Sequence, residues 1–351
     1  MKPNIKLSSL KDITKLILMF FAISLHGDFV SDGMGVVLRP EFKPIIFRPS
    51  SIVPHGTLHK VTFQSRENEL SHKTLTRHGE LLIRENALAT ILICHGYMCD
   101  KNDVAFIRTI FSKYNVMTFD FRAHGENVDN KQCCTFGRNE AFDVIAAAEY
   151  IKQRPELSQK PLIVYGFSMG AVSAIEAQAR GKLFDAMVLD CPFDSSDNII
   201  KKALNDMTFS FLGFEFSLPG KAVLHKFAYN HYVQSMVKVM LKTIAKFDAL
   251  QTKTRILPVS PVASIEKIDV PCYFITCKND EKVPVESVTA VFAGARGYKR
   301  LWITNGRRHF DSFFYSPEIY SRIINTFLSK VIKGELTGDI SAKVIADPDV
   351  G

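Results

Sequence analysis

The sequence predicts an α/β fold in which a mostly parallel sheet carries helices on both faces. Apolar runs without alternation, such as Leu88–Cys94 and Asn115–Asp120, are typical of strands that are covered on both sides. These runs alternate with helical patterns, such as 103–113 and 138–154, which indicates consecutive β-α-β units. Ligands of such folds bind at the carboxyl ends of the strands, so functional side chains are expected in the loops that follow them.

The predicted sheet is of the eight-stranded type. Its strands are expected at 59–65, 80–84, 88–94, 115–120, 162–167, 185–190, 272–277 and 299–304. An amphipathic helix is expected to close the domain at 319–332. The chain is therefore predicted to have four parts, which are a signal-like or anchor segment (1–25), an extended lead-in (26–58), the α/β domain (59–332) and a flexible tail (333–351).

The N-terminal segment has the layout of a secretory signal. Its first fifteen residues carry four lysines and one aspartate, and Leu16–Leu25 is apolar apart from Ser24. This apolar run is too short to span a bilayer, and Ala22-Ile23-Ser24 offers a candidate cleavage site. Export or membrane anchoring is favoured, and a helix packed on the domain of a cytoplasmic protein is the alternative.

A long insertion separates the sixth and seventh predicted strands. About eighty residues lie between Asp190 and Cys272, whereas one crossover needs far fewer, so a helical cap is predicted at about 195–262. Between residues 201 and 255, nine Lys or Arg stand against three Asp or Glu. The cap is interpreted as a subdomain with a solvated lysine face, or as a lid that contacts anionic lipid or guides an acidic substrate. It contains four closely spaced phenylalanines, Phe209, Phe211, Phe214 and Phe216.

Composition and cysteine usage narrow the classes of function. Among 351 residues, 46% are hydrophobic and 23% are charged, so a full globular core is expected. The net charge of +8 is compatible with an anionic partner or a membrane surface, and no nucleic-acid partner is expected. The seven cysteines show no metal-ligand spacing, so free thiols are expected rather than a metal site or a disulfide scaffold.

The stretch Leu162–Gly170 has the pattern of a nucleophile elbow. A β-branched apolar run meets Gly-Phe-Ser-Met-Gly and passes at once into a strong helix pattern. Gly166 and Gly170 lack a Cβ, so the strand and the helix can approach closely on either side of Ser168. Ser168 is therefore the candidate nucleophile, and a glycine-rich turn in some other α/β fold is the alternative.

The partners of a serine nucleophile follow it along this fold in the order acid, then histidine. Among the three histidines after Ser168, His309 alone lies in the loop after the final predicted strand, and it is the candidate base. Asp280, in the loop after the preceding strand, is the candidate acid. Asp194 is the fallback for the acid, and Glu281 is a lesser alternative.

The oxyanion site requires two N–H donors near the serine. The N–H of Met169 directly follows the nucleophile, and the N–H of Tyr97 lies in the loop after the strand 88–94. The Tyr97 hydroxyl is expected to form a pocket wall rather than to donate. His124 is expected to pin the loop Phe121–Gly125.

These residues together resemble the α/β-hydrolase superfamily over about 59–332. Within it, the chain is similar to the serine aminopeptidase-like, acylglycerol-lipase-like and prolyl-oligopeptidase-like branches. Ala123 replaces the usual glycine after the fourth strand, and Arg307 and Arg308 replace part of a glycine-rich loop, so the subfamily is left open. The motifs that carry the resemblance lie at 95–97, 120–125, 166–170, 190–193, 279–284 and 309.

The resemblance implies acyl transfer in two steps, in which Ser168 attacks a carbonyl and water releases the acyl-enzyme. It implies no metal and no organic cofactor, and a small acyl ester, a thioester or a short peptide as the substrate. The phenylalanine-rich cap favours apolar acyl groups. An acyltransferase with the same triad and a non-catalytic binding protein with the same fold are the alternatives.

Overall fold

The structure, a computed structural model, describes residues 34–35, 55–128, 132–206, 208–211, 214–217, 220–235, 253–336 and 343–347. The chain divides into a larger unit, 45–196 with 252–351, and a smaller unit, 1–44 with 197–251. The predicted signal-like segment (1–25) and residues 236–252 of the predicted cap lie outside the described residues. Within these ranges, no helix combines the length and the apolar character needed to cross a membrane.

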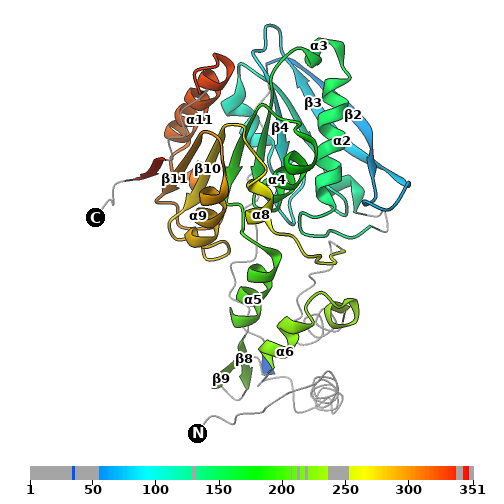
Figure 1. Cartoon of the computed structure of the whole chain (residues 1–351), viewed down its shortest axis with the longest axis vertical. Helices are drawn as coiled ribbons and strands as arrows, with labels where there is room; N and C mark the ends of the chain where they lie inside the picture. Colours follow the sequence, from blue (N-terminus) through cyan, green and yellow to red (C-terminus); the bar gives the residue numbers. More distant parts are fainter. Residues whose placement is uncertain are drawn as a thin grey trace. The chain divides into compact units, whose positions relative to one another are not determined.

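The sheet of the larger unit has the order β12-β11-β10-β7-β6-β4-β5-β3-β2 (Figure 1). The pairs β2–β3 and β3–β5 are antiparallel, and all other neighbours are parallel, so the predicted α/β fold with a mostly parallel sheet is confirmed. The strands are Thr57–Arg66 (β2), Thr74–Ile83 (β3), Thr90–Cys94 (β4), Asn115–Phe119 (β5), Leu162–Phe167 (β6), Ala186–Asp190 (β7), Cys272–Cys277 (β10), Lys299–Thr304 (β11) and Lys343–Ala346 (β12).

Helices cover both faces of this sheet, as expected from the non-alternating strands. On one face, contacts link α2 (Glu140–Lys152), α4 (Met169–Gly181), α8 (Pro261–Ile265) and α9 (Val285–Gly294) (Figure 1). On the other face, they link the 3-10 helix η2 (Ala105–Phe111) with α11 (Pro317–Ile332), which follows α10 (Ser312–Tyr315). Two shorter elements, η3 (Gly125–Asn127) and α3 (Pro155–Ser158), lie in the connections.

The central strand β6 shows why both faces are apolar. Ile163, Tyr165 and Phe167 belong to the core cluster that α11 contributes to. Successive side chains of a strand point to opposite faces, so Leu162 and Val164 face α4 instead. All six residues of β6 are buried, and a strand of this kind cannot alternate apolar with polar residues.

The C-terminal tail differs from the prediction over four residues. Lys343–Ala346 form β12, which pairs in parallel with β11 and adds a ninth strand to the expected eight. Without β12, the backbone groups along this edge of β11 would be unpaired, and a short apolar segment can satisfy them. The prediction of a loose tail therefore does not hold for this segment.

The smaller unit also differs from a purely helical cap. Its three-stranded antiparallel sheet has the order β1 (Met34–Gly35), β8 (Thr208–Phe211) and β9 (Phe214–Ser217). Its described helices include α5 (Ser196–Asp206), whose first residue belongs to the larger unit, and α6 (Lys221–Lys226). The four phenylalanines lie in the hairpin of β8 and β9. Phe alternates with Thr, Ser and Glu there, and this period of two favours strands over a helix.

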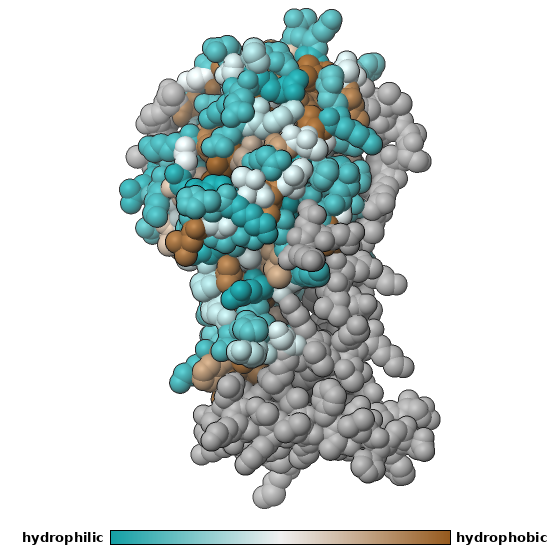
Figure 2. All heavy atoms as spheres, turned by 90° about the vertical axis from the view of Figure 1, so that its right-hand side faces the viewer, coloured by the Kyte–Doolittle hydropathy of each residue, from teal (hydrophilic) through white to brown (hydrophobic). Residues whose placement is uncertain are grey.

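One face of the molecule is mainly polar among its described residues (Figure 2). On the face that Figure 2 shows, hydrophilic residues predominate and hydrophobic residues form smaller areas between them. This distribution agrees with helices that bury one side against the sheet and expose the other.

Candidate active site

Ser168 lies at the turn between β6 and α4. Its backbone has φ 48° and ψ −114°, a conformation that a residue with a Cβ adopts only when the surrounding structure enforces it. A Cβ on Gly166 would lie 2.6 Å from Ala171 Cα, and one on Gly170 would lie 2.2 Å from Cys94 O. Both glycines are therefore required by close backbone contacts, and the turn has the local geometry of a nucleophile elbow.

His309 and Asp280 are brought together by the loops after β11 and β10. His309 Nδ1 lies 2.7 Å from Asp280 Oδ2, and Asp280 Oδ1 accepts the N–H groups of Lys282 and Val283, each at 2.9 Å. Burial raises the pKa of the Asp280 carboxyl, but the charge and hydrogen bond of His309 and the two backbone donors lower this pKa by a larger amount. The net pKa is below the ordinary value, so Asp280 is a carboxylate that can orient an imidazole.

An aromatic contact joins the serine turn to the histidine loop. The rings of Phe167 and Phe310 are 4.0 Å apart between centroids and meet edge to face. Phe167 precedes Ser168 and Phe310 follows His309 along the chain. Phe310 has a positive φ of 70°, which turns the chain directly after His309. The predicted nucleophile and the predicted base therefore flank one packed contact.

The loop after β4 passes next to the serine turn. A Cβ on Gly96 would lie 3.7 Å from Phe167 O and 3.8 Å from Ser168 Cβ. In the part of the chain that the structure describes, the N–H groups of Tyr97 and Met169 have no hydrogen-bond acceptor. Two N–H donors are thus available beside the serine.

The Tyr97 side chain points to a different partner. Its hydroxyl lies 2.8 Å from Thr254 Oγ1, and burial raises its pKa to about 12. The Tyr97 ring packs against Phe136, whose ring in turn packs against Phe193. These contacts are those of a wall-forming aromatic side chain.

Asp194, the fallback acid, and Asp311, which follows His309 closely along the chain, have different contacts. The Asp194 carboxylate accepts the N–H of Ser195 at 2.7 Å, and the Asp311 carboxylate accepts the N–H of Arg307 at 2.8 Å. Among the acids that the sequence offered, the hydrogen bond to His309 is made by Asp280. In the insertion, His225 pairs with Asp197 within the smaller unit.

Sequence reasoning missed the position of Cys191. Its ligand atom lies within 4.8 Å of those of Asp280 and His309, and within the described ranges this is the one Cys/His/carboxylate group with metal-like spacing. Because His309 and Asp280 already share a hydrogen bond, the group is a dyad with a neighbouring thiol. All seven cysteines are free thiols, as the sequence indicated, and the 190–193 motif that contains Cys191 assigned no role to its thiol.

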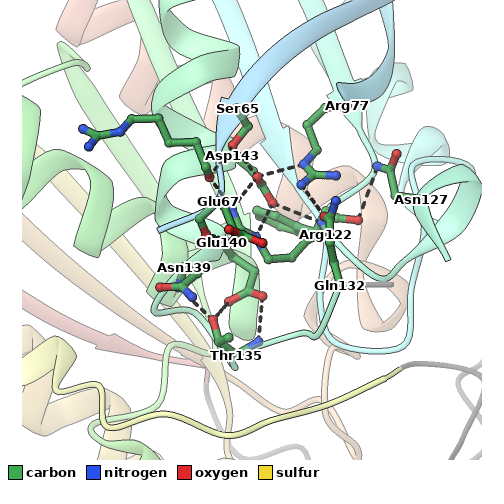
Figure 3. A network of polar contacts seen from close by, with 12 residues as sticks. Ser65, Glu67, Arg77, Arg122, Asn127, Gln132, Thr135, Asn139, Glu140 and Asp143 are labelled. Atoms are coloured by element: carbon green, nitrogen blue, oxygen red, sulfur yellow. Dashed lines mark hydrogen bonds and ion pairs between the residues drawn. The ribbon is translucent and has the colours of Figure 1, made fainter. Parts of the chain in front are cut away.

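A buried ionic network fixes the loop after β5. Asp143 of α2 binds the guanidinium groups of Arg122 and Arg77 and the hydroxyl of Ser65 (Figure 3). A second carboxylate, Glu140, accepts hydrogen bonds from the N–H and the hydroxyl of Thr135. Asp143 and Glu140, one turn apart on α2, therefore hold two segments of the connection between β5 and α2.

The fold and this geometry define a class of protein. The chain belongs to the α/β-hydrolase family, whose model matches residues 91–322. The uncharacterized protein YqkD of Bacillus subtilis is 28% identical over 247 residues, which cover 69% of this chain and 72% of the relative.

Two solved structures illustrate the range of similar proteins. The esterase Pf2001 of Pyrococcus furiosus has a TM-score of 0.54 and 21% identity, over 80% of this chain and 98% of that one. An acylaminoacyl peptidase of Pyrococcus horikoshii has a TM-score of 0.54 and 13% identity, over 81% of this chain and 43% of that one. These likenesses concern the fold, and together with the family they support a hydrolase activity.

Proposed function

We propose that this protein is a serine hydrolase that cleaves carboxylic esters, thioesters or small amides. Ser168 is the nucleophile, His309 is the base and Asp280 is the acid that orients it. The observation that carries the proposal is the 2.7 Å contact between His309 Nδ1 and Asp280 Oδ2, in a loop that packs against the serine turn. The strained backbone of Ser168 supports it, because this conformation presents a side chain at a turn between strand and helix.

The proton positions follow from this contact. The Asp280 carboxylate accepts a hydrogen bond, so His309 carries its proton on Nδ1 and leaves Nε2 as the base. Nε2 takes the Ser168 proton as Oγ attacks the substrate carbonyl, and the tetrahedral oxyanion accepts the N–H groups of Tyr97 and Met169. Nε2 then protonates the leaving group, and a water molecule repeats the sequence to release the acid.

Apolar acyl groups are the proposed substrates. The rings of Tyr97 and Phe136 are 5.0 Å apart and those of Phe136 and Phe193 are 5.5 Å apart, so aromatic surface adjoins the loop that carries the Tyr97 N–H. Rates with p-nitrophenyl esters should therefore rise from acetate to longer chains. Equal rates along the series would contradict this preference, and aminoacyl-naphthylamides run in parallel would separate an esterase from a peptidase.

A fluorophosphonate probe tests the proposed nucleophile. The parent protein should be labelled, the Ser168→Ala variant should not, and the exposed-site control Ser158→Ala should be labelled like the parent. An unlabelled parent, or equal labelling of Ser168→Ala, would refute the serine-hydrolase proposal. In assays with the ester series, Ser168→Ala should lose hydrolysis and Ser158→Ala should hydrolyse the esters like the parent.

A further inference from the structure

His124 connects the loop after β5 to the loop that carries Tyr97. The N–H of Met98 donates to His124 Nε2 at 3.2 Å, so Nε2 must be unprotonated. The ring proton then lies on Nδ1, which donates to the carbonyl of Arg122 at 2.8 Å. His124 is 2% exposed, so water does not compete for these bonds. The imidazole is thus a fixed bridge between two loops.

The Arg122 end of this bridge is rigid. The Arg122 N–H donates to Asp143 Oδ2 at 3.1 Å, and its guanidinium binds both oxygens of the same carboxylate. Arg77 Nε donates to the same carboxylate, to Oδ1 at 2.8 Å (Figure 3). A carbonyl whose own residue is held at main chain and side chain is a stable acceptor for His124.

The Met98 end of the bridge is a strained turn. Cys99 N–H donates to Gly96 O at 3.3 Å, which closes a turn around Tyr97 and Met98. Met98 has a positive φ of 62°, which glycine usually supplies at the third position of a type II turn. Without a bond to the Met98 N–H, the turn loses a contact that holds its central peptide, and the backbone of Tyr97 and Met98 can shift toward a less strained conformation. His124 opposes this shift.

We propose that His124 is a positioning residue, which holds the Gly96–Cys99 turn in the conformation that presents the Tyr97 N–H to the oxyanion. This inference rests on the proposed serine-hydrolase function and adds a residue to it. His124 touches neither the substrate nor Ser168; it acts through Met98. A donor that is held before the reaction begins stabilises the transition state more than the bound substrate.

Substitution of His124 tests the proposal through kcat. His124→Ala should lower kcat for a p-nitrophenyl ester by roughly ten- to a hundredfold with KM within about twofold, because a displaced donor weakens only transition-state binding. Affinity for a boronic acid transition-state analogue should fall by the same factor. His124→Gln should recover part of kcat, because its amide oxygen can accept the Met98 N–H. His72→Ala, at an exposed histidine between β2 and β3, should match the parent.

Amide hydrogen exchange provides a second readout that needs no activity. The peptide that contains Met98 should exchange faster in His124→Ala than in the parent and in His72→Ala. Unchanged exchange there would overturn the proposal, as would unchanged kcat, or a loss confined to KM. A parent that fluorophosphonate does not label would refute the proposed function instead, and exchange would still decide whether His124 holds the turn.

Discussion

Asp143 holds both the main chain and the side chain of Arg122. Its oxygens accept the Arg122 N–H at 3.1 Å, Nε at 3.0 Å and Nη2 at 2.8 Å. Arg77 Nε at 2.8 Å and Ser65 Oγ at 2.6 Å bind the same carboxylate, and all four residues are buried. This charge is fully paired, so its removal would leave two buried guanidinium groups without their partner.

The variant Asp143→Asn should therefore lower the free energy of unfolding by about 3–5 kcal/mol near neutral pH, measured by urea denaturation. Glu156→Gln, which removes the acid of an exposed pair with Arg154, should have a much smaller effect. A similar loss in both variants would contradict the assignment of Asp143 as a buried anchor.

The pH dependence of this contribution has a defined sign. Burial raises the pKa of Asp143, but the charges of Arg122 and Arg77 lower this pKa by a larger amount. The folded pKa is therefore below the unfolded value. The stabilisation is present above the unfolded pKa of about 3.9 and is lost as the pH falls through the folded pKa. Acid unfolding should therefore be less steep for Asp143→Asn than for the parent.

Asp190 should respond in the opposite way. Burial raises the pKa of its carboxyl well above the usual range, and its neighbours Tyr320 and Cys191 lie at 2.8 and 3.1 Å. A raised folded pKa stabilises the protein below the unfolded pKa, and this contribution is lost as the pH rises through the folded pKa. Asp190→Asn, a neutral amide of the same shape, should change stability by only about 1 kcal/mol near neutral pH.

Urea denaturation at neutral and higher pH checks this prediction. The stability of Asp190→Asn should decline less than that of the parent as the pH rises. A destabilisation as large as that of Asp143→Asn would show that Asp190 is ionised in the folded protein.

Two glycines near Ser168 should differ in their tolerance of alanine. A Cβ on Gly170 would meet the backbone oxygens of Cys94 at 2.2 Å and His95 at 2.5 Å, which cannot move without disturbing the sheet. A Cβ on Gly96 would meet its nearest atoms at 3.7 Å or more, which is ordinary contact. Gly170→Ala should therefore cost about 3 kcal/mol in thermal unfolding, and Gly96→Ala should stay near the parent. Equal losses would contradict this steric account.

The sequence was informative where the structure depends on local geometry and on chain order. The Gly-x-Ser-x-Gly pattern is local, because the strained turn at Ser168 and its two close contacts involve adjacent residues. The Asp280–His309 contact was expected because the loops after adjacent parallel strands meet at one edge of the sheet. Neither inference needed a side-chain position.

The features that the sequence did not predict depend on long-range packing. Cys191 lies in the 190–193 motif, but no pattern assigned a role to its thiol, and its place beside Asp280 follows from the register of β7 with β10. The contact of His124 with Met98 joins two loops whose conformations are set by packing. The hairpin of β8 and β9 had a visible signal, the alternation of Phe with polar residues, but the length of the insertion favoured a helical cap.

The variant Asp280→Asn tests the acid of the proposed triad. The substituted side chain would present an amide in place of a carboxylate, so His309 would no longer be held with its proton on Nδ1, and Nε2 would no longer be the base. We expect kcat to fall by on the order of 10⁴-fold with little change in KM. Glu281→Gln, at an exposed neighbouring residue, should retain parental kcat.

The size of the loss distinguishes Asp280 from the alternative acids. Burial raises the pKa of Asp280, and His309 is the main group that brings this pKa below the ordinary value. The Asp280 charge is therefore stabilised mainly by His309. A fall of less than about tenfold would mean that another acid, such as Asp194, orients the base during turnover. In that case, Asp194→Asn should produce the large loss that Asp280→Asn does not. A large loss in Asp280→Asn alone would exclude Asp194 and leave the 2.7 Å contact as the one that orients His309.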